Sequence, residues 1–343
     1  MIKIVQTPAS GAFGYVNYGF EAAATYGTVA ANFPRPFGQG TKISISRKNN
    51  MERIHGLGAR NASANVAKKF EGTATIEFLL GAGDTTLAHG GASWLRAVLG
   101  AIPGDAVAGS AWTHTYAESN TLASFSVANA LELGTDYVSA LIGCKVQSCT
   151  ITAAVDEVAK VRLECPYRTE TVASAGIGSA VTPTEVPLTF AQGTLTGKSG
   201  VTIGYVQNVE LTITNNVEMV WGLGSRYSTA GPEKIRTYDV RMTVAFSDVT
   251  LLLENWAGTT VPYTASALAT LNPAGIALVL TFTNGGAGAA LRGVAFTFAN
   301  FYLNEHTLPL DVNEVVKEDV TGWALSCTNI IVTNAQATDV AYP

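Results

Sequence analysis

The sequence predicts a mainly β protein, with two related β-sandwich or barrel domains in tandem and one short α-helix in each. Three observations lead to this prediction. Segments of alternating apolar and polar residues recur along the chain, as expected for strands with one buried face. A twelve-residue phrase, "NNMERIHGLGAR" from Asn49, returns as "NNVEMVWGLGSR" from Asn215. The elements around the two phrases follow one order, which indicates an internal duplication.

The two phrases are identical at seven positions, and their glycines and arginines are 166 residues apart in a chain of 343. Asn-Asn tolerates a left-handed backbone and Gly-Leu-Gly allows close backbone approach, so each phrase predicts a hairpin with an open tip. The shared residues are the candidate assembly contacts: Asn49, Asn50, Glu52, Gly56, Gly58 and Arg60 in the first copy, and Asn215, Asn216, Glu218, Gly222, Gly224 and Arg226 in the second.

Arg60 and Arg226 are expected to donate to a carboxylate or to carbonyls of a neighbour. Glu52 and Glu218 are the natural acidic partners, either within one hairpin or across a subunit boundary. An ordinary loop with a local ion pair explains the same residues equally well. The sequence leaves these two interpretations open.

Residues 1–40 contain Gly, Ala, Pro and aromatic residues without a sustained period, so we expect an extended N-terminal arm there. The first β domain is predicted at 41–170. "KISIS" and "GTATIEFLL" alternate as strands do. "SWLRAVLGAI" predicts a short helix with Ser93 as N-cap and Gly100 as its end, which docking on a sheet must stabilise. Further strands are predicted in "LASFSVANALEL", "GCKVQSCTITA" and "KVRLECPYR".

Residues 171–200 are rich in Gly, Ser, Thr and Pro and predict a linker that contains one edge strand, "VPLTFAQGTL". The second β domain is predicted at 201–343. There "VELTIT" precedes the repeated phrase and "YDVRMTVAF", with Val240 to Phe246 alternating inward, follows it. "DVTLLLENW" predicts the second helix, with Asp248 as N-cap. "IALVLTFTN", "GVAFTFANFYL" and "VTGWALSCTNIIVT" supply the remaining strands.

The composition favours a self-assembling protein. Charged residues are only 14% of the chain, against about 25% in typical soluble domains. Such a surface needs partners to cover its apolar patches; a secreted or thermostable protein with a Thr/Ser surface is the alternative. The net charge is −5 and no basic tract is present, which disfavours tight binding of nucleic-acid phosphates.

The cysteines do not predict a disulfide framework, because the four of them are few and unevenly spread. We expect buried, reduced thiols in a protein made in the cytoplasm. The N-terminus shows no signal peptide, and no run approaches 18 apolar residues, so neither secretion nor a membrane span is predicted.

No enzyme or cofactor site is predicted. The "GLG" turn lacks the third glycine and the following helix of a dinucleotide fingerprint. The four histidines lie far apart, and His55 is replaced by Trp221 in the second phrase, which favours packing over acid–base chemistry. Neither a nucleophile elbow nor a close pair of carboxylates at a strand end is found.

Three stretches carry a family resemblance: "YGTVAANFPRPFGQGTKISISRKNNMERIHGLGARNASANVAKKFEGTATIEFLL", "IGCKVQSCTITAAVDEVAKVRLECPYR" and "VELTITNNVEMVWGLGSRYSTAGPEKIRTYDVRMTVAF". Together they cover 120 of the 343 residues, and they resemble the tail tube proteins of long-tailed, siphovirus-type phages and related archaeal viruses. The resemblance lies in pattern and phrase rather than in one short motif, and the chain after about Asn272 is more divergent.

The resemblance implies a structural virion protein built from tail-tube-like β domains. Six such domains would form a ring, the ring sheets would join into an inner barrel, and stacked rings would enclose a lumen for DNA. Members with a fused pair of domains form trimers with pseudo-sixfold symmetry, and the duplication favours this version. The partners implied are other copies of the chain, the tape measure, terminator and distal tail proteins, and genomic DNA that passes without specific binding.

The arm at 1–40 and the polar hairpin at 47–70 are candidates for bridging adjacent rings. Two other classes of protein stay open. One is a different self-assembling virion or surface β-protein, such as a tail terminator, a decoration protein or a surface-layer subunit. The other is a carbohydrate-binding or hydrolytic β-sandwich, which predicts aromatic platforms beside paired carboxylates that we do not find in the sequence.

Overall fold

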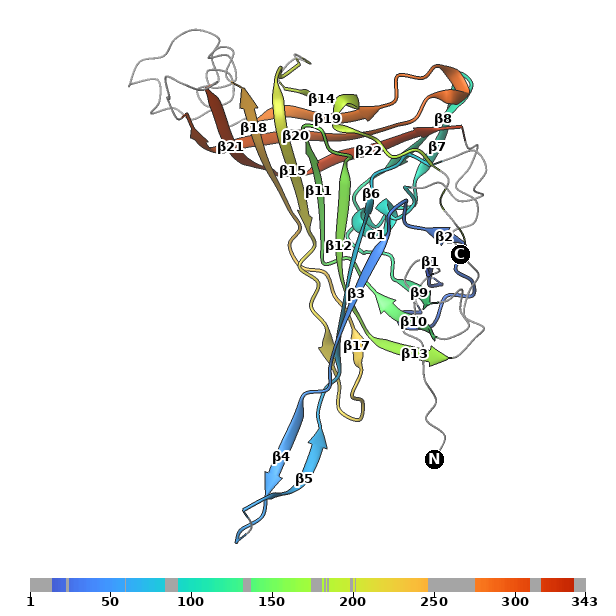
Figure 1. The fold of residues 1–343 in the computed structure, drawn as a ribbon, viewed down its shortest axis with the longest axis vertical. Helices are drawn as coiled ribbons and strands as arrows, with labels where there is room; N and C mark the ends of the chain where they lie inside the picture. Colours follow the sequence, from blue (N-terminus) through green and yellow to red (C-terminus); the bar gives the residue numbers. More distant parts are fainter. Residues whose placement is uncertain are drawn as a thin grey trace, which may run out of the picture.

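The computed structural model describes residues 14–22, 25–58, 60–83, 92–131, 137–173, 181, 183, 185–197, 200, 202–245, 275–308 and 316–335. The protein is mainly β, as predicted. It is elongated, with broad sheets at one end and a hairpin that projects from the other (Figure 1).

The strands before the middle of the chain are β1 Tyr15–Phe20, β2 Arg35–Pro36, β3 Lys42–Lys48, β4 Met51–His55, β5 Ala62–Ala67, β6 Glu71–Leu79, β7 Gly104–Ala108, β8 Ala111–Tyr116, β9 Phe125–Leu131, β10 Tyr137–Cys144, β11 Ser148–Ala154, β12 Lys160–Tyr167 and β13 Thr169–Ala173. The later strands are β14 Gly193–Thr196, β15 Val206–Thr214, β16 Val220–Trp221, β17 Ser228–Ala230, β18 Thr237–Ala245, β19 Ile276–Thr283, β20 Gly293–Thr307, β21 Lys317–Ala324 and β22 Cys327–Asn334. The helical elements within the described residues are α1 Leu95–Leu99 and two single 3₁₀ turns, η3 Phe190–Gln192 and η5 Gly288–Ala290.

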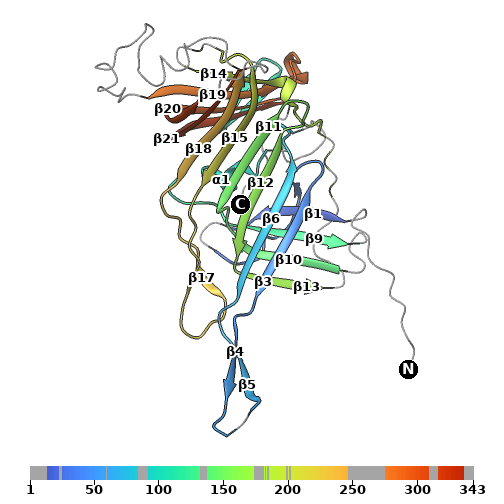
Figure 2. The same ribbon diagram turned by 60° about the vertical axis from the view of Figure 1, so that its left-hand side comes forward.

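One sheet runs through both halves of the chain. Its order begins β3-β6-β12-β11 and continues β15-β18-β21-β20, all antiparallel (Figure 2). The joint between the halves is the pairing of β11 with β15, which aligns Thr150 with Thr212. Their hydroxyl oxygens lie 3.3 Å apart across this joint.

The two groups of four strands pair in the same register. Ile43 faces Ile76 between β3 and β6, and Val209 faces Met242 between β15 and β18. Both pairs differ by the 166 residues that separate the repeated phrases. The third and fourth strands agree as well, with a different spacing: Ser148 faces Glu164, as Glu305 faces Thr321.

A second layer also follows one order in both halves. In the first half the order is β13-β10-β9-β1-β2, and in the second it is β22-β20-β19-β14, where β20 contributes its N-terminal part. Strands β8 and β7 from the first half extend the second layer by pairing with β22. Strand pairing in the described sheet therefore joins the halves at two places, β11–β15 and β8–β22.

The core follows from the alternating pattern. In β6 the buried residues are Gly72, Ala74, Ile76 and Phe78, and in β18 they are Tyr238, Val240, Met242 and Val244. These positions again differ by 166. One apolar cluster takes in residues from both halves. The short helix α1 lies against this core, and Trp94 at its start packs edge to face on Phe78 with ring centroids 5.3 Å apart.

The expectation of an extended arm at 1–40 is wrong for the part that the structure describes. β1 pairs with β9 along its whole length, and Tyr18, Phe20 and Phe37 are buried. Four successive residues of β1 are buried, so both faces of this strand are covered. A strand covered on both faces has no period of two, which is why the sequence pattern did not reveal it.

The predicted cap of the first helix is also wrong. Trp94 occupies the N-cap position and makes no side-chain cap hydrogen bond. The Ser93 hydroxyl is buried and lies 2.7 Å from the Tyr18 hydroxyl, which it contacts instead of the helix backbone. Gly100 ends the helix with φ 98°, as predicted. The second predicted helix, with Asp248, and the inward position of Phe246 lie outside the described residues.

Two further segments differ in detail. "GCKVQSCTITA" is split between the end of β10 and β11. In "VPLTFAQGTL" the turn η3 precedes the short strand β14, which pairs with β19. All four cysteines are free and buried.

Candidate assembly interface

The first repeated phrase forms the hairpin of β4 and β5, which projects from the body (Figure 1). The residue that turns the chain into the hairpin is Asn50, with φ 46°. Its side-chain amide donates to the Lys69 carbonyl at 3.0 Å and so closes the base. Glu52 forms an ion pair with Lys68 across the two strands. The Ser63 hydroxyl donates to the Ile54 carbonyl at 3.1 Å nearer the tip.

The second phrase, with β16 and β17, uses the same bonds. Asn216 has φ 50° and donates to the Ile235 carbonyl at 2.7 Å. Glu218 pairs with Lys234 at 2.5 Å. The Thr229 hydroxyl donates to the Val220 carbonyl at 3.2 Å. The repeated letters therefore preserve a hairpin with one scheme of side-chain bonds.

Both Gly-Leu-Gly turns have only their second glycine in the left-handed region, Gly58 at φ 85° and Gly224 at φ 88°. Gly56 and Gly222 do not need this conformation. The leucine between each pair, Leu57 or Leu223, is fully exposed.

Within the described chain Glu52 and Glu218 do not pair with an arginine, and their pairing across a subunit boundary stays a prediction. Glu52 and Glu218 each pair with a lysine that follows the returning strand of the same hairpin, Lys68 after β5 and Lys234 after β17. Lys68 and Lys234 also differ by 166 residues. Comparison of the segments that follow the two phrases would have found them.

Arg226 connects the second hairpin to the first. Its Nε donates to the Lys68 carbonyl at 2.9 Å and its Nη2 to the Asn49 side-chain oxygen at 3.1 Å. The Arg226 carbonyl accepts the Phe70 amide at 2.8 Å. Main-chain and amide oxygens are therefore the acceptors here, rather than a carboxylate.

Trp221 and Tyr227 complete this contact. The Trp221 indole donates to the Phe70 carbonyl at 3.2 Å, and the Lys69 ammonium lies 4.4 Å from the centre of the indole ring. The Tyr227 and Phe70 rings pack edge to face at 5.8 Å. Sequence reasoning missed Phe70 and Lys69 because they lie outside the repeated letters.

The first asparagine of each phrase, Asn49 or Asn215, has a different role. Asn215 is buried, and its amide donates to the Val98 and Val146 carbonyls at 3.1 Å. Its oxygen accepts Arg236 Nε at 2.6 Å. Asn215 therefore ties the second hairpin to α1 and the first half, whereas Asn49 is an exposed acceptor for Arg226.

A shielded ion pair holds the second hairpin to the first half. Lys145 lies 2.5 Å from Glu233, and both side chains are mostly buried. The Leu122 amide donates to the same carboxylate at 2.9 Å. Burial alone would raise the pKa of Glu233, but the hydrogen bonds from Lys145 and Leu122 outweigh it and lower that pKa.

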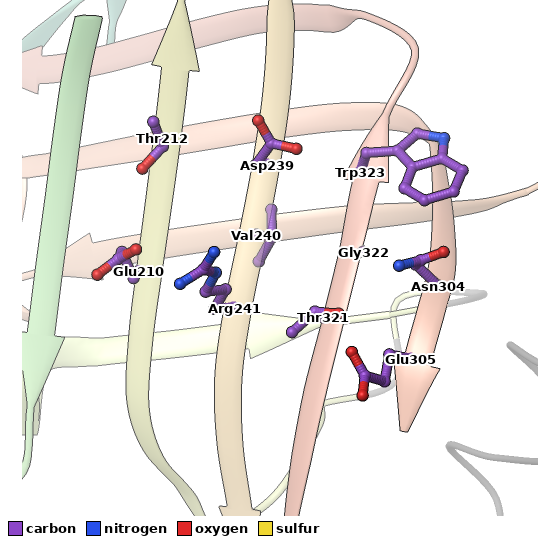
Figure 3. Close-up of a pocket in the computed structure, with 10 residues that line it drawn as sticks. All are labelled: Glu210, Thr212, Asp239, Val240, Arg241, Asn304, Glu305, Thr321, Gly322 and Trp323. Atoms are coloured by element: carbon purple, nitrogen blue, oxygen red, sulfur yellow. The ribbon is translucent and has the colours of Figure 1, made fainter. Parts of the chain in front are cut away.

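The polar face of the continuous sheet carries both signs of charge. Across four strands, Glu210, Arg241, Thr321 and Glu305 lie side by side in register (Figure 3). They line a shallow hollow of about 560 Å³ together with Asp239 and Trp323. Residues of the same face in the first half are Lys42, Glu77, Arg162 and Thr150, which are also in register.

The described residues contain no group of three His, Cys, Asp or Glu side chains that could hold a metal ion. Within the same part of the chain, none of the helices has the length and apolarity needed to cross a membrane.

The long sheet has open strands at its ends, and the second hairpin is bonded to main-chain carbonyls of the first. A family model for the phage tail tube protein matches residues 11–322. The chain therefore belongs to the phage tail tube protein family and is a structural component of the phage tail. No curated protein sequence matches the chain.

Proposed function

We propose that the chain is the major tube subunit of a siphovirus-type tail, that it contains two fused tube modules, and that three copies close a ring with pseudo-sixfold symmetry. Stacked rings enclose a lumen through which genomic DNA passes. The proposal rests on the family and on the repeated strand order of the two halves.

The observation that supports ring closure most directly is the joint between β11 and β15. Within the chain, the last strand of the first four-strand group pairs with the first strand of the second group. The described strands at the two ends of this series are β3 and the C-terminal part of β20, and each has a neighbour in the sheet on one side only. Open edges of this kind are hazardous unless another strand covers them.

A second copy supplies the missing strand at each end. We assume that β20 of one copy pairs with β3 of the next as β11 pairs with β15. The register of this pairing then follows from the equivalent positions of the two halves. Glu305 then faces Lys48, His306 faces Arg47, and Thr307 faces Ser46. The first pair has opposite charges, and the last repeats the hydroxyl pair of Thr150 and Thr212.

The number of copies follows from the number of modules. Each chain supplies two of the six positions of the ring, so three chains close it by head-to-tail contacts. The stacking of rings uses contacts that do not close and therefore gives a filament.

The polar face of the sheet lines the lumen in this arrangement. Its basic residues lie next to acidic ones, as with Arg162, which is 3.6 Å from Glu77 and 3.0 Å from Glu164. Neutralised basic groups and the net charge of −5 keep the lumen from binding phosphate tightly, so DNA can slide. The tape measure, terminator and distal tail proteins are the other proposed partners.

A disulfide experiment tests the closure. The variant Ser46→Cys with Thr307→Cys should form, under mild oxidation, covalent species that contain up to three chains. Thr150→Cys with Thr212→Cys is the matched pair within one chain and should give an internal disulfide. Lys42→Cys with Thr307→Cys shifts the register by four residues, about 13 Å, and should not link. The four native cysteines are buried and leave the result readable.

Failure of the Ser46–Thr307 pair to link chains in assembled material would reject the proposed closure. Rings that link but never stack would instead favour a tail terminator or another capped virion ring.

A further inference from the structure

The second hairpin contacts the first within the chain. The equivalent contact, in which the first hairpin would bind the second, is not made within the described chain. The second hairpin binds the first through Arg226 and Trp221, which contact Lys68 and Phe70. By the spacing of 166, the equivalents of Arg226, Trp221 and Lys68 are Arg60, His55 and Lys234.

Arg60 and Lys234 do not form the bond that Arg226 and Lys68 form. Among the residues that the structure describes, the Arg60 guanidinium makes no hydrogen bond or ion pair, and the Lys234 carbonyl accepts none. The equivalent groups, Arg226 and the Lys68 carbonyl, bond to each other. Arg60 lies between β4 and β5, in the hairpin that projects from the body, whereas Lys234 lies between β17 and β18 (Figure 1).

A hollow marks the corresponding place on the second hairpin. It measures about 580 Å³, and Gln147 of the first half lines it together with residues from both sides of that hairpin: Asn216, Val217, Glu218, Met219, Trp221, Lys234 and Ile235. Ile235 is 78% exposed, although its equivalent, Lys69, lies against Trp221. Trp221 therefore covers Lys69 on the first hairpin, whereas the equivalent position on the second hairpin, Ile235, is left uncovered.

We propose that the first hairpin of one copy docks in this hollow on the second hairpin of the neighbouring copy, with Arg60 donating to the Lys234 carbonyl and His55 lying against Ile235. The docking rests on the proposed ring, because only there does a neighbour's β3 lie beside β20. It forms a second joint, separate from the strand pairing.

This joint is weaker than the one inside the chain. Asn215 cannot serve Arg60 as Asn49 serves Arg226, because its oxygen already accepts Arg236 at 2.6 Å. His55 also offers less aromatic area than Trp221. Arg60 therefore has one carbonyl acceptor where Arg226 has two oxygens.

Cysteine linkage between copies tests the docking. A mixture of one variant with His55→Cys and another with Ile235→Cys should link across copies, since both positions lie at the proposed contact. Adding Arg60→Ala should lower the linkage rate about tenfold, as expected for loss of a charge-assisted hydrogen bond. Arg53→Ala removes the same charge from the same hairpin and should leave the rate unchanged.

The Ser46–Thr307 pair separates the two proposals. If that pair links chains but His55 and Ile235 do not, the ring stands and the hairpin docking is overturned. If neither pair links, the ring itself fails. An equal loss of linkage with Arg53→Ala and Arg60→Ala would show that bulk charge, rather than the Lys234 carbonyl, controls the contact, and would also overturn it.

Discussion

Arg226 donates from Nε to the main-chain carbonyl of Lys68 at 2.9 Å, although 158 residues separate the two positions. This bond, with the Arg226 Nη2 bond to Asn49, fixes the second hairpin on the base of the first. The acceptors are a backbone carbonyl and an amide oxygen, so the planar guanidinium can bind both without any acidic partner.

Replacement of Arg226 by Ala should loosen the first hairpin. Two hydrogen bonds from a charged donor are lost, which should lower the free energy of unfolding by about 2 kcal/mol. Hydrogen exchange of the amides at 50–70 should become faster, while that of β11 and β12 stays slow. Arg53→Ala is the control. An unchanged exchange rate at the Phe70 amide in Arg226→Ala would contradict the role assigned to this residue.

Substitution of Asn216 should separate backbone strain from hydrogen bonding. Asn216→Ala places a residue without a local hydrogen bond at φ 50° and removes the bond to Ile235. It should destabilise the protein by about 1–2 kcal/mol. Asn216→Gly relieves the backbone and should cost less. Thermal unfolding of both variants gives the comparison, and equal losses would show that the left-handed backbone adds nothing.

The Lys145–Glu233 pair should make stability fall in acid. Because the folded pKa of Glu233 is lowered, its stabilisation is fully present above the unfolded value of 4.5 and is lost as the pH falls through the folded pKa. Glu233→Gln should therefore flatten the loss of stability below about pH 4.5. Urea unfolding between pH 7 and pH 3 measures it. A variant with the wild-type pH dependence would exclude this carboxylate as the cause.

Basic residues on the polar sheet face should make the tube retain DNA. Glu210 lies beside Arg241 on that face and Glu77 lies beside Arg162, and replacement of either one by Lys removes an acidic neighbour. Each phosphate then neutralised should steepen the salt dependence of DNA binding by about 0.9 in log–log slope. Glu52→Lys on the projecting hairpin is a control of equal charge. If this control binds DNA as tightly as the face variants, the face does not line the lumen.

Much of the fold is predictable because half-buried strands keep a clear alternation. β6 and β18 show it over their full length, with Ala74 and Val240 at equivalent buried positions. The duplicated phrase also placed two hairpins correctly after β3 and β15. The repeated order of strands in the second layer was not predicted, because those strands pair with partners distant in sequence.

The prediction failed where tertiary contacts override local signals. Serine is a favoured N-cap residue, but the Ser93 hydroxyl is hydrogen-bonded to the buried Tyr18 hydroxyl instead. Residues of β1 carry no period of two because both faces are covered. In the candidate interface the repeated phrases identified Arg226 but not Phe70. The backbone amide and carbonyl of Phe70 form its hydrogen bonds there, and no side-chain pattern reveals them.

A cross-section of the assembled tube, by electron cryomicroscopy at a resolution that separates strands, tests the central proposal most directly. The account predicts threefold rings in which six similar modules surround the lumen and β20 of each chain pairs with β3 of the next, with Glu305 opposite Lys48. A ring of six chains, or β3 and β20 without a strand from a neighbour, would contradict it.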